Sequence, residues 1–150
     1  PTCRAARVMS FPDGQETGLP MNVERFNPPT MMTPLGSYCQ ATRRGLFVAV
    51  AGVAAIGKDG KLIGGGDIVA QTRATIENMR LALEAAGAGI EDVLTVTCFI
   101  TDFGNYQGFN QAFSEIFAEH PPARATVRAD LVIPELLIEM DAIAVLPTSN

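Results

Sequence analysis

The sequence lacks most of the side chains from which metal centres and histidine-based catalytic groups are built. It contains one histidine, His120, no tryptophan, and three cysteines that stand far apart, Cys3, Cys39 and Cys98. These cysteines form no C-x-x-C pair and no zinc-ligand spacing, so we expect reduced, structural thiols. A single histidine cannot build a multi-histidine metal site. Any histidine-based catalytic dyad would have to include His120.

Long apolar runs and clusters of positive charge are also missing. No apolar run approaches the roughly 20 residues that a helix needs to span a bilayer, and residues 1–20 lack the apolar segment of a secretory signal. The 16 acidic and 11 basic residues give a net charge of −5, and only Arg43 and Arg44 form an adjacent basic pair. Nucleic-acid binding relies on clustered Lys and Arg. We therefore expect a cytoplasmic protein with no nucleic-acid and no membrane partner.

The 150 residues suit one domain, preceded by a segment of different character. Residues 1–20 are polar and aperiodic, which predicts a disordered leader or extension, and residues 21–150 are expected to form a single domain. Within it, residues 37–42 can form a short strand. The apolar run 46–56 is followed by a Gly-Lys-Asp-Gly turn signal, which predicts a hairpin with residues 61–63.

Helices and strands then alternate along the chain. Asp67 is a suitable N-cap for a helix that runs to Ala86 and is stopped by Gly87. The β-branched run 93–100 predicts a central strand, and apolar spacing predicts a helix over 105–119. The last two strands are expected at 124–133 and 137–146.

This order predicts an α+β fold, a single-layer mixed β-sheet with two helices on one face. A sheet whose other face is wet should alternate apolar and polar residues, yet residues 46–56 and 93–100 scarcely alternate. No element remains in the chain to cover that second face. We therefore expect another subunit to cover it, and hence a homo-oligomer.

Arginine and carboxylate side chains are the best candidates for chemistry. Arg124 begins a predicted strand, and Glu139 lies inside a very apolar one, with Asp141 on the same face. A carboxylate there is costly to bury unless it is paired. Glu139 could form an ion pair with Arg124 at a subunit interface, or face solvent at a sheet edge. Alternatively, Arg124 could bind a substrate carboxylate while Glu139 acts on water as a general base.

Four motifs resemble those of the reactive-intermediate deaminase (Rid, or YjgF) family. The run PPARATVRADLVIPELLIEMDAIAV resembles its C-terminal signature of P-A-R-S, a Leu-Pro segment and v-E-i-e-a-I-A, and residues 66–102 resemble its helix and following strand. Asn110 falls on the v-N-x-x-[YF] motif, and Tyr38 falls on the G-x-Y-x-x-[AG] loop. The resemblance covers about residues 36–146.

The resemblance implies a trimer like chorismate mutase, with three pockets between subunits and a small imine or enamine carrying a carboxylate as substrate. It implies that Arg124 binds the substrate carboxylate and that Glu139 positions the attacking water. The backbone carbonyl of Thr126 would accept the imine N–H, while Tyr38 and Asn110 would line or support the pocket. No metal and no organic cofactor are implied. The expected enzyme is a hydrolase that converts 2-imino or enamino acids to 2-oxo acids and ammonia.

The chain departs from the family pattern in the pocket wall. The family's S-G-Q segment is Ala51-Gly52-Val53 here, of which Gly52 and Val53 are candidate substrate-binding residues, and the Ser and Cys after the arginine are Ala125 and Thr126. These changes leave two alternatives open. One is a pathway-specific deaminase of the 2-aminomuconate or aminoacrylate type. The other is a non-catalytic, small-carboxylate-binding or regulatory trimer.

Overall fold

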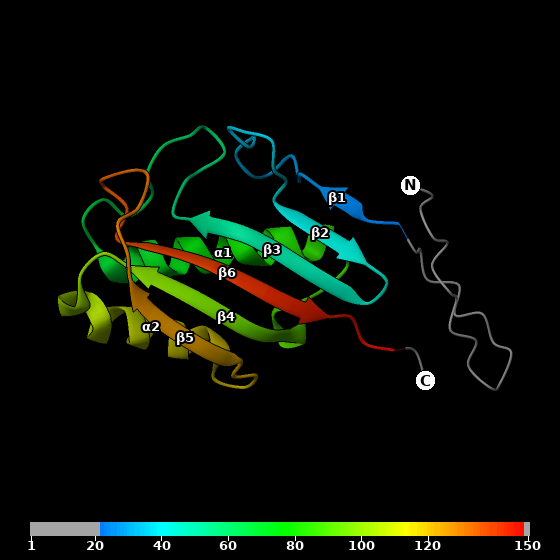
Figure 1. Ribbon diagram of the computed structural model, residues 1–150. Coiled ribbons are helices and arrows are strands. Elements are labelled where there is room, and N and C mark those ends of the chain that lie inside the picture. The colour runs from blue at the N-terminus through cyan, green and yellow to red at the C-terminus, as the bar shows by residue number, and fades with distance from the viewer. Residues whose placement is uncertain (1–21, 149–150) are drawn as a thin grey trace, which may run out of the picture.

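Two α-helices lie against the same face of a six-stranded β-sheet (Figure 1). The computed structural model describes residues 22–148, so the leader predicted for residues 1–20 lies outside the described residues. The strand order is β1-β2-β3-β6-β4-β5; only β4 and β5 run parallel, so the sheet is mixed. This confirms the predicted fold class. The elements are β1 (Glu24–Phe26), β2 (Ala41–Arg44), β3 (Phe47–Ala54), α1 (Ile68–Ala85), β4 (Val93–Ile100), α2 (Tyr106–Phe117), β5 (Ala123–Arg128) and β6 (Ile138–Val145).

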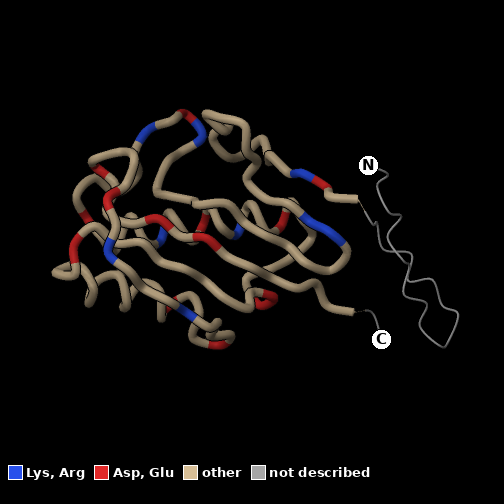
Figure 2. The backbone as a smooth tube through the Cα atoms, in the orientation of Figure 1, with Lys and Arg blue, Asp and Glu red and all other residues tan. Residues whose placement is uncertain are grey.

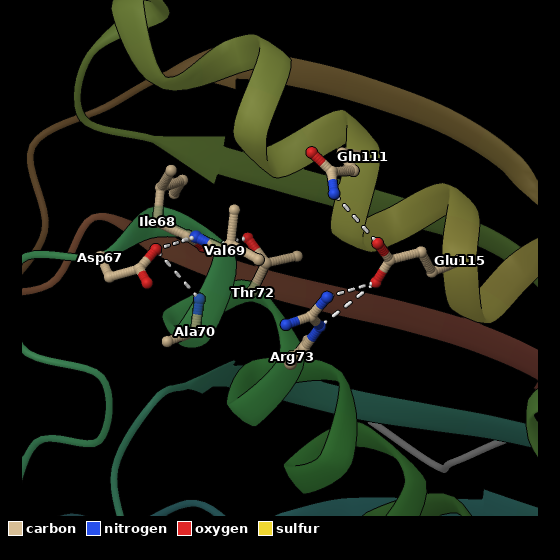
Figure 3. Close-up of polar contacts among 8 residues, drawn as sticks. All are labelled: Asp67, Ile68, Val69, Ala70, Thr72, Arg73, Gln111 and Glu115. Atoms are coloured by element: carbon tan, nitrogen blue, oxygen red, sulfur yellow. Dashed lines mark hydrogen bonds and ion pairs between the residues drawn. The ribbon is translucent and has the colours of Figure 1, made fainter.

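Helix α1 begins and ends at the residues that its sequence signals indicate. The Asp67 side chain accepts hydrogen bonds from the backbone N–H groups of Val69, at 2.8 Å, and Ala70, at 3.3 Å (Figure 3). At the other end Gly87 adopts φ +87°, a left-handed conformation that side chains disfavour. Both predicted boundaries are thus confirmed to within one residue.

Helix α2 packs beside α1 on the same face of the sheet. Its buried side carries Phe109, Phe113 and Phe117, and the last two rings are stacked with centroids 4.4 Å apart. On the outer side, Arg73 of α1 pairs with Glu115 of α2 at 2.6 Å (Figure 3). This ion pair is exposed and contributes little to stability. Apolar packing therefore holds the helix pair in place.

The main core lies between the sheet and the helices. Strand residues such as Val96, Cys98 and Met140 are fully buried against Met79 and Leu83 of α1. Burial raises the pKa of the Cys98 thiol to about 12, so it stays protonated and unreactive. The prediction that Cys98 is a core residue is confirmed.

The sheet face that points away from the helices is apolar and uncovered in the single chain. Phe47, Leu94, Val127 and Ile143 each remain at least 41% exposed. Lys and Arg are spread over several elements and do not gather on one face (Figure 2). Among residues 22–148, no helix is both long and apolar enough to cross a membrane. A trimer that covers the exposed face remains a prediction.

The predicted hairpin across residues 57–60 forms, but it is shorter than a strand pair. Its turn is crossed by one antiparallel bridge, between Ile56 and Leu62, with backbone hydrogen bonds from Gly57 N to Lys61 O and from Ile63 N to Ala55 O. Strand β3 itself pairs with β2, through a turn in which Gly45 has φ +60°, and with β6. Strand β1 was not predicted, β2 begins at Ala41 and β5 ends at Arg128. Strands β1 and β2 carry too few residues for a clear period-2 pattern, and β5 lies at the edge of the sheet.

Candidate active site

Glu139 lies on the face of the sheet opposite the helices, at an irregularity in the neighbouring strand. It pairs with Phe99 of β4 on one side and with Ala54 of β3 on the other, and the register of β3 shifts between Val50 and Val53. The Glu139 carboxylate lies over Gly52 inside this bulge, where a Cβ atom would overlap its Oε1. Only glycine leaves room for the carboxylate there.

The Glu139 carboxylate is half-buried and has no hydrogen-bond partner within residues 22–148. Its pKa is raised, first because burial disfavours the charged form and second because Asp141 lies near it on the same strand face. A raised pKa makes the ionised carboxylate a stronger base. Perturbed carboxyl groups of this kind cluster at functional sites.

A cavity of about 580 Å³ opens beside Glu139. Tyr38, Gly52 and Val53 line it together with Glu139, so the structure brings these four predicted site residues to one place. The Val53 side chain is nevertheless part of the main core, since it is 3% exposed and pairs with the buried Met140. The volume lies within the roughly 300–1,000 Å³ typical of small-molecule pockets.

Two amide side chains of α1 hold the cavity walls in position, and sequence reasoning did not assign them this role. The Gln71 Nε2 donates to the carbonyls of Gly65, at 2.6 Å, and Glu135, at 3.0 Å, and its Oε1 accepts from Leu137 N at 2.8 Å. The wall residue Leu136 lies between Glu135 and Leu137, the two residues that Gln71 binds on this side. The sequence signal that could have identified Gln71 is a polar residue on the side of α1 that carries apolar side chains.

Asn78 has the same role for the other wall. Its Nδ2 donates to the carbonyl oxygens of Ala54, at 2.7 Å, and Ile56, at 2.9 Å, both at the end of β3. Because Asn78 is seven residues after Gln71, the two amides project from the same side of the helix. Helix α1 thus supports both wall segments that surround Glu139.

Arg124 lies on the other face of the sheet, at its β5 edge. Its register partner is the buried Val96, which places it on the helix side. The guanidinium lies over the rings of Phe109 and Phe113, with Cζ 5.0 and 4.6 Å from their centroids. It donates to Asn110 Oδ1 at 2.9 Å. The arginine is thereby held in one orientation, although it remains partly exposed.

The predicted site residues therefore form two separate groups. Arg124 and Asn110 contact each other, and Thr126 follows on the same face of β5; the Tyr106 hydroxyl joins them, accepting from Arg124 at 3.3 Å. Tyr106 was not identified as a site residue from the sequence. No ion pair between Arg124 and Glu139 forms among residues 22–148. Within that range, no cluster of three or more His, Cys, Asp or Glu side chains could hold a metal ion.

Comparisons with known proteins agree with the fold and with the motifs. Residues 29–146 match the family model described as "Endoribonuclease L-PSP". A RutC family protein of Pyrococcus abyssi is 41% identical over 111 residues, which cover 74% of this chain and 87% of that protein. The 3-aminoacrylate deaminase RutC of Acinetobacter baylyi is 35% identical over 111 residues, covering 74% of this chain and 88% of that enzyme.

Solved structures share the same architecture. The crystal structure of E. coli TdcF with bound serine has a TM-score of 0.76 and 26% identity, and the match covers 83% of this chain and 99% of that one. The family match spans most of the chain, and the relatives align over nearly their whole length. The chain is therefore a member of the reactive-intermediate deaminase (Rid, or YjgF) family, which the matching family model describes as Endoribonuclease L-PSP.

Proposed function

We propose that this protein hydrolyses reactive 2-imino and enamino acids to 2-oxo acids and ammonia. The observation that carries the proposal is the unpartnered, half-buried Glu139 carboxylate at the wall of a cavity suited to a small molecule. A carboxylate in this state can accept a proton from a bound water. The deaminase name of the Acinetobacter relative supports the same class of reaction.

The complete site is proposed to form between two copies of the chain in a homotrimer. Each copy carries the Glu139 group on one face of its sheet and the Arg124 group at the β5 edge on the other face. A neighbouring copy that covers the exposed apolar face would bring its Arg124 to the cavity beside Glu139. This arrangement supplies the anion-binding side chain that the cavity of a single chain lacks.

The reaction needs no redox step. Arg124 of one copy binds the substrate carboxylate through its planar fork of N–H donors. Glu139 of the neighbour takes a proton from water as the water oxygen bonds to the imine carbon, and the imine nitrogen gains a proton. The C–N bond of this carbinolamine then breaks, ammonia leaves, and the hydroxyl loses its proton to give the 2-oxo acid. An enamine enters the same sequence after protonation at carbon.

The backbone carbonyl of Thr126 is proposed to accept the N–H of the imine. An acceptor there favours the protonated iminium, in which the carbon is most open to attack by water. Tyr38 lies at the mouth of the cavity, 48% exposed, where it can contact the substrate. Asn110 acts on the substrate through Arg124, because its side-chain oxygen holds the guanidinium. These groups position the reactants, which is the main requirement for a bond that already hydrolyses slowly unaided.

The first test is a trapping assay on 2-iminopropanoate, generated by an amino-acid oxidase and captured with semicarbazide. The protein should suppress trapping. Arg124→Ala should lose both binding and turnover, by about 100-fold or more in kcat/KM, because a charge-assisted anchor is gone. Glu139→Gln should lose mainly turnover. Unchanged constants in both variants would contradict the assignment, and 2-oxo acid binding without turnover would select a binding protein.

A mixing experiment tests the site between subunits. Arg124→Ala and Glu139→Gln chains, each inactive alone, are co-expressed and purified as mixed oligomers. If each site takes Arg124 from one copy and Glu139 from its neighbour, about one site in four regains both side chains by chance. Activity should return to about a quarter of wild type. No recovery would show that both residues act within one chain or that the oligomer is absent.

The description of the family model suggests a different activity, that of a ribonuclease. A ribonuclease would need positive charge along its substrate, whereas this chain has a net charge of −5 and spreads its basic residues over several elements (Figure 2). The name 3-aminoacrylate deaminase instead supports an enamine substrate, so 3-aminoacrylate belongs among the compounds to be assayed.

A further inference from the structure

The cavity beside Glu139 is apolar on nearly every side. Its walls include Met31, from the main core, and four side chains of a smaller apolar cluster, Met32, Ile56, Ile133 and Leu136. A charge or an uncompensated polar group placed against such a wall loses its hydration without gaining a hydrogen bond. The wall therefore favours hydrocarbon.

The side-chain amide nitrogens in the wall already donate hydrogen bonds within the protein. Asn78 donates to Ala54 and Ile56, and the Gln40 Nε2 donates to the carbonyl of Met32 at 3.0 Å. Tyr38 and Glu139 are the two remaining polar side chains that line the cavity, and Glu139 is needed for water. A hydrogen-bond acceptor on the substrate side chain would therefore find few free donors there.

Two exposed apolar side chains stand at the mouth of the same cavity. Val132 is 97% exposed and Leu35 is 82% exposed, and they come from loops far apart in the sequence. Neither belongs to the core, yet both line a cavity whose walls are mostly apolar. Their position extends the apolar wall outward along the path by which a substrate enters.

We propose that the substrates are 2-imino acids with a branched or extended apolar side chain, of the leucine type, and that Leu35 and Val132 contribute to this preference. The inference rests on the proposed function, because it takes the carboxylate to Arg124 of a neighbouring copy and the imine carbon to Glu139. With both ends held, the side chain of the substrate is the part directed at the apolar wall. The cavity of about 580 Å³ has room for it.

The size of the preference follows from hydrocarbon burial. Each buried methylene contributes about 0.8 kcal/mol, which corresponds to about a fourfold gain in affinity. An isobutyl group in place of methyl should therefore raise kcat/KM by at least about tenfold. A side chain of the same size that ends in an amide should gain nothing, because its carbonyl oxygen would lose its hydration without gaining a donor.

The test compares three imines produced by an amino-acid oxidase from alanine, leucine and asparagine, with the semicarbazide signal normalised to the rate of imine production. We expect kcat/KM for the leucine imine to exceed that for the alanine imine by at least about tenfold, and the asparagine imine to be no better than the alanine imine. The products give a second readout: 4-methyl-2-oxopentanoate should inhibit turnover at least about tenfold more strongly than pyruvate.

A pair of matched substitutions locates the preference. Val132→Thr combined with Leu35→Gln should bring the leucine-to-alanine ratio close to one, whereas Val23→Thr, at an exposed site outside the cavity, should leave that ratio unchanged. Turnover of the alanine imine with no gain for leucine would overturn this inference while leaving the proposed function intact. No turnover of any of the three imines would instead overturn the proposed function.

Discussion

The two halves of the candidate site are built in opposite ways. The Arg124 guanidinium is stacked over two phenylalanine rings and bound by Asn110, so its orientation is set before any ligand arrives. The Glu139 carboxylate has no such partner within residues 22–148, and space for it is made by the absence of a side chain at Gly52. One half is held by contacts, and the other is kept free of them.

This difference suits the two tasks. A group that binds an anion gains affinity when it is already oriented, because less side-chain entropy is lost on binding. A general base must instead keep its lone pairs available, so any hydrogen bond to it within the protein would compete with water. The support for Glu139 therefore comes from the backbone around it, which the amides of α1 hold in place.

The largest effect is expected at Gln71, which supports only the Glu139 half. Gln71→Leu would leave the carbonyls of Gly65 and Glu135 and the N–H of Leu137 without a partner. At about 1 kcal/mol for each of the three part-buried hydrogen bonds that are lost, the free energy of unfolding should fall by about 3 kcal/mol. Urea unfolding measures this. Arg73→Leu, which removes an exposed ion pair from the same helix, should cost less than about 1 kcal/mol. Equal losses in both variants would show that Gln71 is an ordinary helix residue.

Gly52→Ala is the next test, and it acts on position without removing a functional group. The added Cβ would displace the flexible Glu139 side chain, so the fold should persist while kcat falls by about 100-fold, the cost of a misplacement of about 1 Å. Gly36→Ala is the matched control in the same cavity, because its Cβ would meet Tyr38 at an ordinary 3.7 Å. Wild-type kcat in Gly52→Ala would show that the observed position of Glu139 is not the active one.

A substitution at Asn110 is expected to have a smaller effect, on the Arg124 half of the site. Asn110→Ala removes the hydrogen bond that orients Arg124 but leaves both phenylalanine rings beneath it. A hydrogen bond to a charged group contributes about 1.5–3 kcal/mol, so KM should rise at least about tenfold with a smaller change in kcat. Gln111→Ala, on the next residue, contacts only Glu115 and should change neither. A fall in kcat alone would assign Asn110 to the reaction itself.

Local signals predicted the helices and the central strand well. The carboxylate of Asp67 and the left-handed Gly87 set the ends of α1 by short-range contacts, and both can be recognised from the residues themselves. Strand β4 was predicted with the right bounds because its eight residues are β-branched or apolar throughout. The pairing of strands could not be predicted in the same way, since β3 pairs with β6, which lies far along the chain.

The site shows the same limit. Arg124 and Glu139 could be identified from their residue types and from the resemblance, but the sheet face of each depends on register. Strand β5 pairs parallel with β4 and β6 pairs antiparallel, and the loop between β5 and β6 breaks any count of alternating residues. Gln71 and Asn78 were missed because a polar residue on a helix is usually solvent-exposed. Their role depends on carbonyl groups from distant segments.

The smallest effect concerns the charge beside the free carboxylate. The pKa of Glu139 is raised by burial and, secondly, by Asp141, so Asp141→Asn should lower it and move the acid limb of the kcat–pH profile to lower pH. Burial and the proposed Arg124 of the neighbouring copy act alike in both proteins, so the difference between the two limbs measures the effect of Asp141. Glu119→Gln, at an exposed site outside the strands, should leave the limb in place.

The same substitution has a consequence for stability, with a definite sign. Because the pKa of Glu139 is higher in the folded than in the unfolded chain, its contribution to stability is fully present below the unfolded pKa and is lost as pH rises through the folded pKa. Asp141→Asn narrows the pH range between the unfolded and the folded pKa of Glu139. As pH is raised through that range, the melting temperature of the variant should therefore fall less than that of wild type. If the acid limb of the kcat–pH profile or the melting profile of Asp141→Asn were identical to wild type, the charge of Asp141 would not affect the pKa of Glu139. Burial alone would then raise that pKa.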